Sequence, residues 1–126
     1  MPDLGFRENV MGPQPIGKVV VAPAEMTAAL DALMRALMSG DRGAAEAITE
    51  PQVLEDLRQI ANAIAPGVYD KYELVGRARI GQHFFNKVRL TGAKPMTIQF
   101  RLGMNGERWT VREATNLTGR RSGWSK

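Results

Sequence analysis

The sequence contains no cysteine, and this absence removes several classes of site. No disulfide framework, thiolate metal site or cysteine nucleophile can form. His83 is the only histidine, so neither a closed zinc site nor a two-histidine iron site can be assembled. We therefore expect no metal, and we interpret His83 as a strand residue near the surface of a sheet.

Long apolar runs and phosphate-binding loops are also missing. No segment approaches the roughly 18 apolar residues that a membrane span requires. The sequence has neither GxxxxGK[ST] nor GxGxxG after a strand, so no nucleotide or other cofactor is expected. The first residues include Asp3 and Glu8 and have no apolar centre, unlike a signal peptide. A cytoplasmic location is the default expectation, and export after loss of a leader is the alternative.

The charge is distributed unequally along the chain, although the net charge is only +4. Residues 1–70 carry five basic and ten acidic side chains, a balance of −5, whereas residues 71–126 carry twelve and three, a balance of +9. Such asymmetry is informative about partners rather than about fold.

The 126 residues, of which 44% are hydrophobic, suit one globular domain. Proline and glycine are frequent in residues 1–23, which we predict to be a flexible N-terminal arm, with 18–22 as a short extended segment. Residues 24–118 form the predicted domain, and 119–126 form a basic C-terminal tail.

Helical spacing dominates the first half of the domain. The first helix is predicted over Ala24–Ser39 and is stopped by Gly40. Asp41 should cap a short second helix. Thr49 and Gln52 are predicted to form a capping box that opens a third helix, which ends at Pro66.

After Gly67 the hydrophobic period changes from 3.6 to 2. Strands are predicted near 72–80, 84–90, 96–104 and 109–117, with Asn105–Gly106 as a tight hairpin turn. Apolar residues alternate with polar ones, as in an antiparallel sheet covered on one side. The predicted fold is therefore α+β, with N-terminal helices packed on a curved four-stranded antiparallel meander.

This element order, together with the phrases ALMSGDRGAAEAIT and GERWTVREATNLT, resembles the nuclear transport factor 2-like superfamily over residues 24–118. That group includes SnoaL-like polyketide cyclases, ketosteroid isomerases and many non-enzymatic binding domains. The usual extra strand pair is not evident, so a reduced or cystatin-like roll is expected. In enzymes of this fold an acidic side chain in the cone between helices and sheet often transfers the proton.

Strict alternation places a few polar side chains inside that cone. The predicted ligand-binding residues are Tyr72, Asn86, Trp109, Glu113 and Thr115. A carboxylate held there would resist ionisation, which suits a general acid or base, so Glu113 is the candidate catalytic residue. The alternatives are that a bulge turns Glu113 outward, that an arginine neutralises it, or that it lies at the open rim.

The same alternation places cations on the outer face of the sheet. The predicted anion-binding or partner-binding residues are Arg77, Arg79, Lys87, Arg89, Arg101 and Arg112. An acidic protein segment, nucleic acid or an anionic membrane surface would each match such a face, and the scarcity of aromatic residues disfavours nucleic acid. Ordinary solvent-facing arginines are the alternative interpretation. The resemblance implies a homodimer through this face, whereas like charge opposes it.

We compare three functions. The favoured one is a non-catalytic binding domain that takes a small apolar ligand in the cone or an acidic partner on the basic face. A structural accessory domain that uses the arm and the tail as tethers comes second. The third is a small isomerase, cyclase or dehydratase in which Glu113 shuttles a proton on an apolar substrate.

Overall fold

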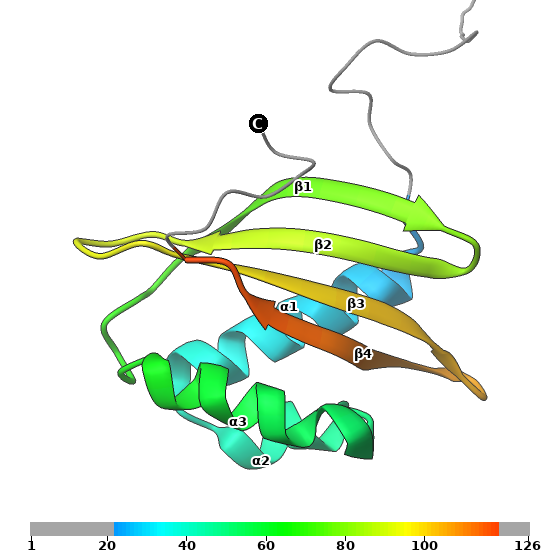
Figure 1. Cartoon of the computed structure of the whole chain (residues 1–126), viewed down its shortest axis with the longest axis horizontal. Coiled ribbons are helices and arrows are strands. Elements are labelled where there is room, and N and C mark those ends of the chain that lie inside the picture. Colours follow the sequence, from blue (N-terminus) through cyan, green and yellow to red (C-terminus); the bar gives the residue numbers. More distant parts are fainter. Residues whose placement is uncertain (1–21, 119–126) are drawn as a thin grey trace, which may run out of the picture.

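The computed structural model describes residues 22–118 and places helices on one side of an antiparallel sheet (Figure 1). The predicted arm up to residue 21, including most of its extended segment, and the tail from residue 119 lie outside the described residues. The elements are α1 (Ala24–Ser39), α2 (Arg42–Ala47), the 3₁₀ turn η1 (Pro51–Val53), α3 (Leu54–Ala63), β1 (Tyr72–Ile80), β2 (His83–Leu90), β3 (Met96–Asn105) and β4 (Arg108–Asn116). The predicted α+β class and the four-stranded meander are confirmed.

Helix α1 has the predicted bounds, and its ends show why. Pro23 precedes the first turn in an extended conformation, where its missing N–H costs nothing. Gly40 closes the helix with φ 83°, a left-handed conformation that favours glycine. The buried side of α1 carries leucine, methionine and alanine, at the helical spacing that predicts it.

The start of the second helix is confirmed, and the predicted capping box is wrong. The Asp41 carboxylate accepts a hydrogen bond from the Ala44 N–H at 3.1 Å, so it caps α2. Thr49 instead donates its hydroxyl to the Ala45 carbonyl at 2.8 Å. The backbone around Thr49 forms a parallel bridge with Val111 at the edge of β4, and this bridge removes Thr49 from any capping position.

The sheet has the order β1-β2-β3-β4, so each strand pairs with its neighbours in the sequence. Gly81 and Gly106, with φ 62° and 67°, occupy the tight turns between β1 and β2 and between β3 and β4. Helix α3 and η1 lie against β4, and α1 crosses beneath the sheet (Figure 1). Among residues 22–118 no strand intervenes between α2 and α3, which matches the reduced roll expected from the sequence.

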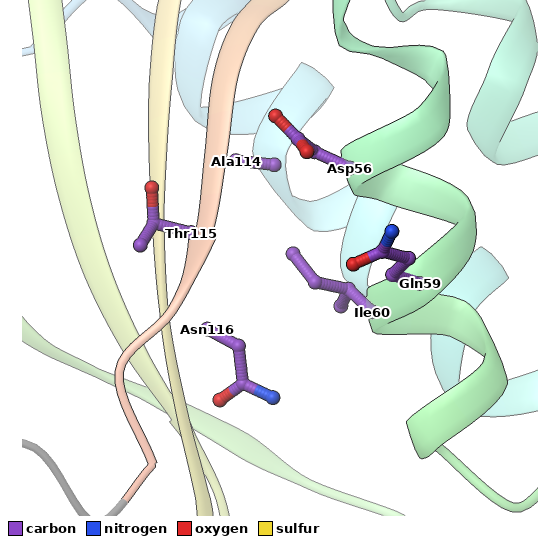
Figure 2. Close-up of a pocket in the computed structure, with 6 residues that line it drawn as sticks. All are labelled: Asp56, Gln59, Ile60, Ala114, Thr115 and Asn116. Carbon is purple, nitrogen blue, oxygen red and sulfur yellow. The ribbon is translucent and has the colours of Figure 1, made fainter.

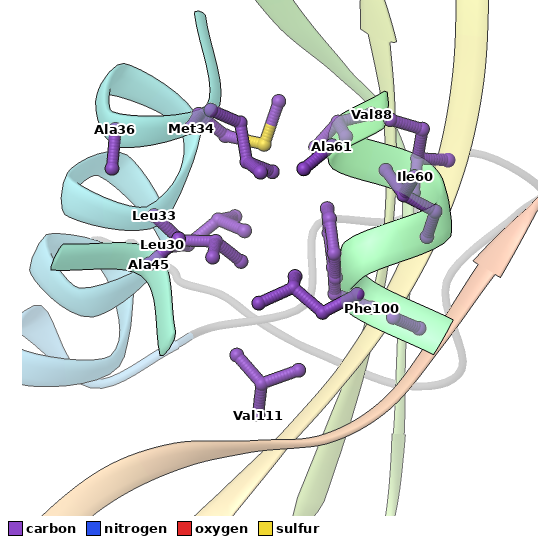
Figure 3. Packing of buried hydrophobic residues seen from close by; sticks show 14 of the residues in the cluster. Leu30, Leu33, Met34, Ala36, Ala45, Ile60, Ala61, Val88, Phe100 and Val111 are labelled. Atoms are coloured by element: carbon purple, nitrogen blue, oxygen red, sulfur yellow. The ribbon is translucent and has the colours of Figure 1, made fainter. Parts of the chain in front are cut away.

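Side chains from the helices and the sheet meet across the interior of the cone (Figure 3). Phe100, Val88 and Val111 come from the sheet, and Leu33 and Ile60 come from α1 and α3. Phe100, Val88 and Val111 are completely buried, as is Leu33. The centre of the cone is therefore occupied by packed side chains rather than by an open ligand cavity.

Two β-bulges break the alternation on which the site predictions depend. In β1, Leu74 pairs with Val88 but Gly76 pairs with Lys87, so Val75 is an extra residue. In β4, Val111 pairs with Leu102 but Glu113 pairs with Arg101, so Arg112 is extra. Each extra residue transfers the following side chains to the opposite face of the sheet.

The bulges correct four of the predicted placements. Arg77 pairs with the buried Asn86 and Arg79 with the buried Phe84, so both arginines lie on the helix side of the sheet. Glu113 and Thr115 flank Ala114, which faces the buried Phe100, so both lie on the outer side. The prediction from strict alternation that Glu113 and Thr115 lie inside the cone is therefore wrong. The prediction that Arg77 and Arg79 lie on the outer face is wrong for the same reason.

Candidate functional site

Tyr72 lies on the helix side, as predicted, and is engaged by α1. Its hydroxyl donates to Asp31 Oδ1 at 2.7 Å, while Arg35 Nε lies 2.8 Å from Asp31 Oδ2. Burial, and then the hydrogen bond to Asp31, raises the pKa of Tyr72 to about 12. The hydrogen bonds from Arg35 and Tyr72 lower the pKa of Asp31. Tyr72 is therefore a neutral hydrogen-bond donor, and its hydroxyl is already used in the bond to Asp31.

Asn86 also lies on the helix side and is completely buried. Its Oδ1 accepts a hydrogen bond from Arg77 Nε at 2.6 Å, and its Nδ2 donates to the Phe84 carbonyl at 3.4 Å. Burial lowers the pKa of Arg77. The hydrogen bond between them gives a partner both to the buried Asn86 amide and to the partly buried Arg77 cation. Both residues therefore have a structural role.

A cavity of about 400 Å³ opens at one end of the cone. We call it the mouth pocket, and its lining residues are Ala22, Pro23, Arg79, Gln82, Phe84, Met104 and Trp109. The Trp109 and Phe84 rings meet edge to face, with centroids 5.9 Å apart and planes at 66°. The Arg79 guanidinium carbon lies 5.8 Å from the Phe84 ring centroid, and its Nε donates to the Gly81 carbonyl at 3.0 Å.

The mouth pocket combines apolar walls with one cation. Met104 is 38% exposed and Trp109 is half-buried, so apolar surface remains accessible there. Of the five predicted ligand residues, the pocket contains only Trp109. Arg79 joins it through the bulge in β1, which strict alternation did not anticipate. Gly76, a glycine inside a strand pattern, was the available signal for that bulge.

Glu113 lies on the outer side, where Arg101 accompanies it. The Arg101 Nε and Glu113 Oε1 atoms are 3.2 Å apart, and the Glu113 side chain is 49% exposed. The contact is an ion pair rather than a hydrogen bond, because Arg101 Nε lacks suitable hydrogen-bond geometry. Glu113 therefore has neither the burial nor the position that a general acid in the cone needs.

Four of the six predicted cations occupy the outer face, and their charges are partly neutralised. Arg89 lies 3.5 Å from Glu73, and Arg101 pairs with Glu113. Lys87 is buried, and burial lowers its pKa. This face is consequently less cationic than the sequence alternation predicts.

His83 lies on the outer face among arginines. Its Nδ1 is 3.1 Å from Arg101 NH1, and Arg112 NH2 donates to the Met104 carbonyl at 2.9 Å. Burial, followed by the charges of Arg101 and Arg112, lowers the pKa of His83. A neutral imidazole whose Nδ1 accepts the Arg101 hydrogen is therefore the expected state.

A second cavity of about 400 Å³ lies between α3 and β4 (Figure 2). We call it the α3–β4 groove, and it is lined by Asp56, Gln59, Ile60, Ala114, Thr115 and Asn116. Asp56 and Gln59 project from α3 toward the strand, whereas the Thr115 side chain points away from α3. Sequence reasoning missed this groove, because periodicity does not show which helix lies beside which strand edge.

Neither metal ligation nor membrane spanning is indicated by the described residues. Across residues 22–118, no three histidine, aspartate or glutamate side chains gather closely enough to hold a metal ion. In the same part of the chain, no helix has the length and apolar character needed to cross a bilayer.

Comparison with known proteins supports the fold. No known sequence-family profile matches the chain, and no curated protein does. A structure of an NTF2-like protein of unknown function from Shewanella baltica OS155 matches with a TM-score of 0.57 and 12% identity, over 71% of this chain and 87% of that one. A second, from Silicibacter pomeroyi DSS-3, has a TM-score of 0.56 and 15% identity, over 72% and 90%.

A third NTF2-like protein of unknown function, from Burkholderia xenovorans LB400, has a TM-score of 0.52 and 15% identity, over 79% of this chain and 89% of that one. The chain therefore has the nuclear transport factor 2-like fold, as its element order predicts. Identities this low establish the fold alone, and function must be argued from the site.

Proposed function

We propose that this protein is a non-catalytic binding domain whose mouth pocket receives a small apolar ligand with an anionic group. The observation that carries the proposal is the composition of the pocket: Phe84, Trp109 and Met104 form apolar walls, and Arg79 is a cation at their side. Small-ligand sites typically combine apolar walls with a few polar groups that fix orientation. A guanidinium favours a carboxylate, sulfonate or phosphate on the ligand.

The arrangement of the cone favours binding over catalysis. Its centre is filled by side chains such as Phe100 and Met34. Glu113, the candidate proton shuttle, lies on the other side of the sheet. Tyr72 already donates its hydroxyl to Asp31. The isomerase, cyclase or dehydratase alternative therefore loses the carboxylate on which it depended.

The outer face supports a second, weaker candidate function, which is contact with another protein. Lys87, Arg89, Arg101 and Arg112 remain there, but Arg89 and Arg101 have carboxylate partners. This pairing reduces attraction for an acidic partner. It also reduces the repulsion between like charges that would oppose a homodimer through this face, so the proposal includes self-association. A cytoplasmic location is also part of the proposal.

A matched pair of fluorescent probes tests the mouth pocket. 1-Anilinonaphthalene-8-sulfonate carries an aromatic body and a sulfonate, and N-phenyl-1-naphthylamine is its uncharged counterpart. We expect both to bind, the sulfonate at least tenfold more tightly. Trp109→Ala should weaken both probes at least tenfold, while Arg79→Gln should weaken only the sulfonate.

Arg89→Gln provides the control, because it removes a cation from the outer face and leaves the mouth pocket unchanged. It should alter neither dissociation constant, as measured by fluorescence titration and calorimetry. The proposal is wrong if the Trp109 and Arg79 variants bind both probes as the unmodified chain does. It is also wrong if Arg89→Gln is the substitution that reduces binding.

A further inference from the structure

The edge of β4 beside α3 offers backbone hydrogen-bonding groups that the sheet does not use. The Leu117 N–H donates to the Thr97 carbonyl at 2.8 Å, while the Thr97 N–H donates to Thr118 Oγ1 at 3.1 Å, so Thr97 and Leu117 occupy a hydrogen-bonded position of the ladder through one bond. Hydrogen-bonded and non-hydrogen-bonded pairs alternate along an antiparallel ladder. Asn116, opposite Ile98, and Ala114, opposite Phe100, are therefore in non-hydrogen-bonded pairs.

The N–H and C=O groups of Ala114 and Asn116 consequently point away from β3, toward the groove. Residues 22–118 supply no backbone partner for them. Earlier on the same edge, the situation is different. The Val111 N–H donates to the Ile48 carbonyl at 2.8 Å, and the Glu50 N–H donates to the Val111 carbonyl at 3.0 Å. Within residues 22–118 the edge is thus paired at Val111 and open at Ala114 and Asn116.

The wall opposite this open edge is acidic and polar. Asp56 lies on the α3 side of the groove and is exposed (Figure 2). It has no ion-pair partner among residues 22–118, whereas the neighbouring Glu55 accepts a hydrogen bond from Gln59 Nε2 at 3.2 Å. Ile60 and Ala114 are buried apolar residues between the two walls. The groove therefore combines an unpaired carboxylate, an apolar floor and an open strand edge.

We propose that an extended, basic segment of a partner protein binds in the α3–β4 groove as a fifth strand. Its backbone would exchange hydrogen bonds with Ala114 and Asn116, as in β-augmentation. Side chains alternate along a strand, so every second one would face α3. One of these would be apolar and lie on Ile60, and the next would be a lysine or arginine that pairs with Asp56.

This inference is independent of the mouth pocket, because the two sites share no residue. The partner is argued from charge complementarity and from the backbone groups rather than from apolar area. An acidic segment would place like charge against Asp56 and Glu55, which disfavours it.

The test uses the full chain and the peptide acetyl-Thr-Val-Thr-Lys-Thr-Val-amide, with binding followed by calorimetry and by amide shifts and hydrogen exchange in NMR. We expect the peptide to shift and protect the Ala114 and Asn116 amides. Replacing its lysine by glutamate should weaken binding at least tenfold. N-methylation of alternate peptide amides on the β4-facing edge, with the side chains unchanged, should abolish binding.

Asp56→Asn should reduce the preference for the lysine peptide over the glutamate peptide at least fivefold, while Glu107→Gln, an exposed acid at the β3–β4 turn, should not. Absence of binding at millimolar peptide, binding elsewhere, or indifference to N-methylation would overturn the proposal. Prior protection of these amides in the peptide-free chain would also overturn it. Concentration-dependent protection would identify a second copy as the occupant, and concentration-independent protection would identify another segment of the same chain.

Discussion

Arg101 and Glu113 face each other across β3 and β4 on the side of the sheet opposite the helices, with Arg101 Nε 3.2 Å from Glu113 Oε1. The pair forms because Arg112 is an extra residue in β4, and this bulge moves the Glu113 side chain from the helix side of the sheet to the outer side. Glu113 consequently serves a surface ion pair and has no access to the cone.

Glu113→Gln should therefore have little effect. Exposed ion pairs contribute about 0–1 kcal/mol, so the free energy of unfolding should fall by no more than about 1 kcal/mol in urea titrations. Binding of both fluorescent probes should stay unchanged. Glu73→Gln, which breaks the comparable pair with Arg89, is the matched control. A loss of probe binding in Glu113→Gln alone would return Glu113 to the ligand site.

The sequence predicts the elements of this fold well, because each depends on local signals. Gly40 and Asp41 mark helix ends, and Asn105–Gly106 marks a hairpin, within a few residues of chain. The sequence predicts less well which face of the sheet each strand residue occupies. The side of the sheet to which a residue points depends on the number of residues before it in the strand. One extra residue therefore moves every later side chain of that strand to the opposite side.

The two bulges differ in how visible they are. Gly76 adjoins Val75 and lies inside a strand pattern, which is a recognised signal of a bulge. Arg112 is flanked by Val111 and Glu113, and no glycine or proline marks it. The first reversal was accessible from the sequence, whereas the second depends on pairing with β3 and required the structure.

Tyr72→Phe should remove an alkaline transition from the chain. The folded pKa of Tyr72 is about 12, compared with 10.0 for the ordinary side chain. The folded state thus retains the phenol proton where the unfolded state has lost it, and stability falls as pH rises from about 10 to about 12. Absorbance titration at alkaline pH should show a late-titrating phenol that the variant lacks.

The same substitution should cost about 0.5–1.5 kcal/mol near neutral pH, the usual net value of a hydrogen bond, because Asp31 loses a donor. The difference in unfolding free energy between the two proteins should shrink through the alkaline window. A difference that grows with pH would contradict the hydrogen bond as its cause.

Asn86→Leu should be strongly destabilising although it adds apolar volume. The change removes the acceptor of Arg77 Nε, and an unsatisfied buried polar group costs about 1–3 kcal/mol. Replacing Arg77 by leucine as well removes the unsatisfied group, so the double variant should recover part of the loss. Urea unfolding of the two single variants and the double variant gives the coupling directly. Additive losses would show that the two side chains act independently.

Gly103→Ala should disrupt the outer face at one position. A Cβ on Gly103 would lie 2.7 Å from His83 Cδ2 and 2.8 Å from Arg112 Cδ, so both side chains, or the backbone at Gly103, must shift. We expect a loss of about 1–3 kcal/mol, the usual cost of overpacking. Adding His83→Ala should restore part of the stability, because it removes the nearest obstacle. If Gly103→Ala proves neutral, the two side chains yield easily and do not need the glycine.

Gly43→Ala is the matched control, because it makes the same chemical change in α2. The nearest atom to its added Cβ is Asp41 Oδ1 at 3.9 Å, an ordinary contact. Alanine is favoured over glycine inside a helix by roughly 0.5–1 kcal/mol, so this variant should be slightly more stable than the unmodified chain. Urea unfolding should therefore separate the two substitutions in sign as well as in size. A loss of stability in both variants would indicate a general intolerance of added volume rather than the specific approach of His83 and Arg112 to Gly103.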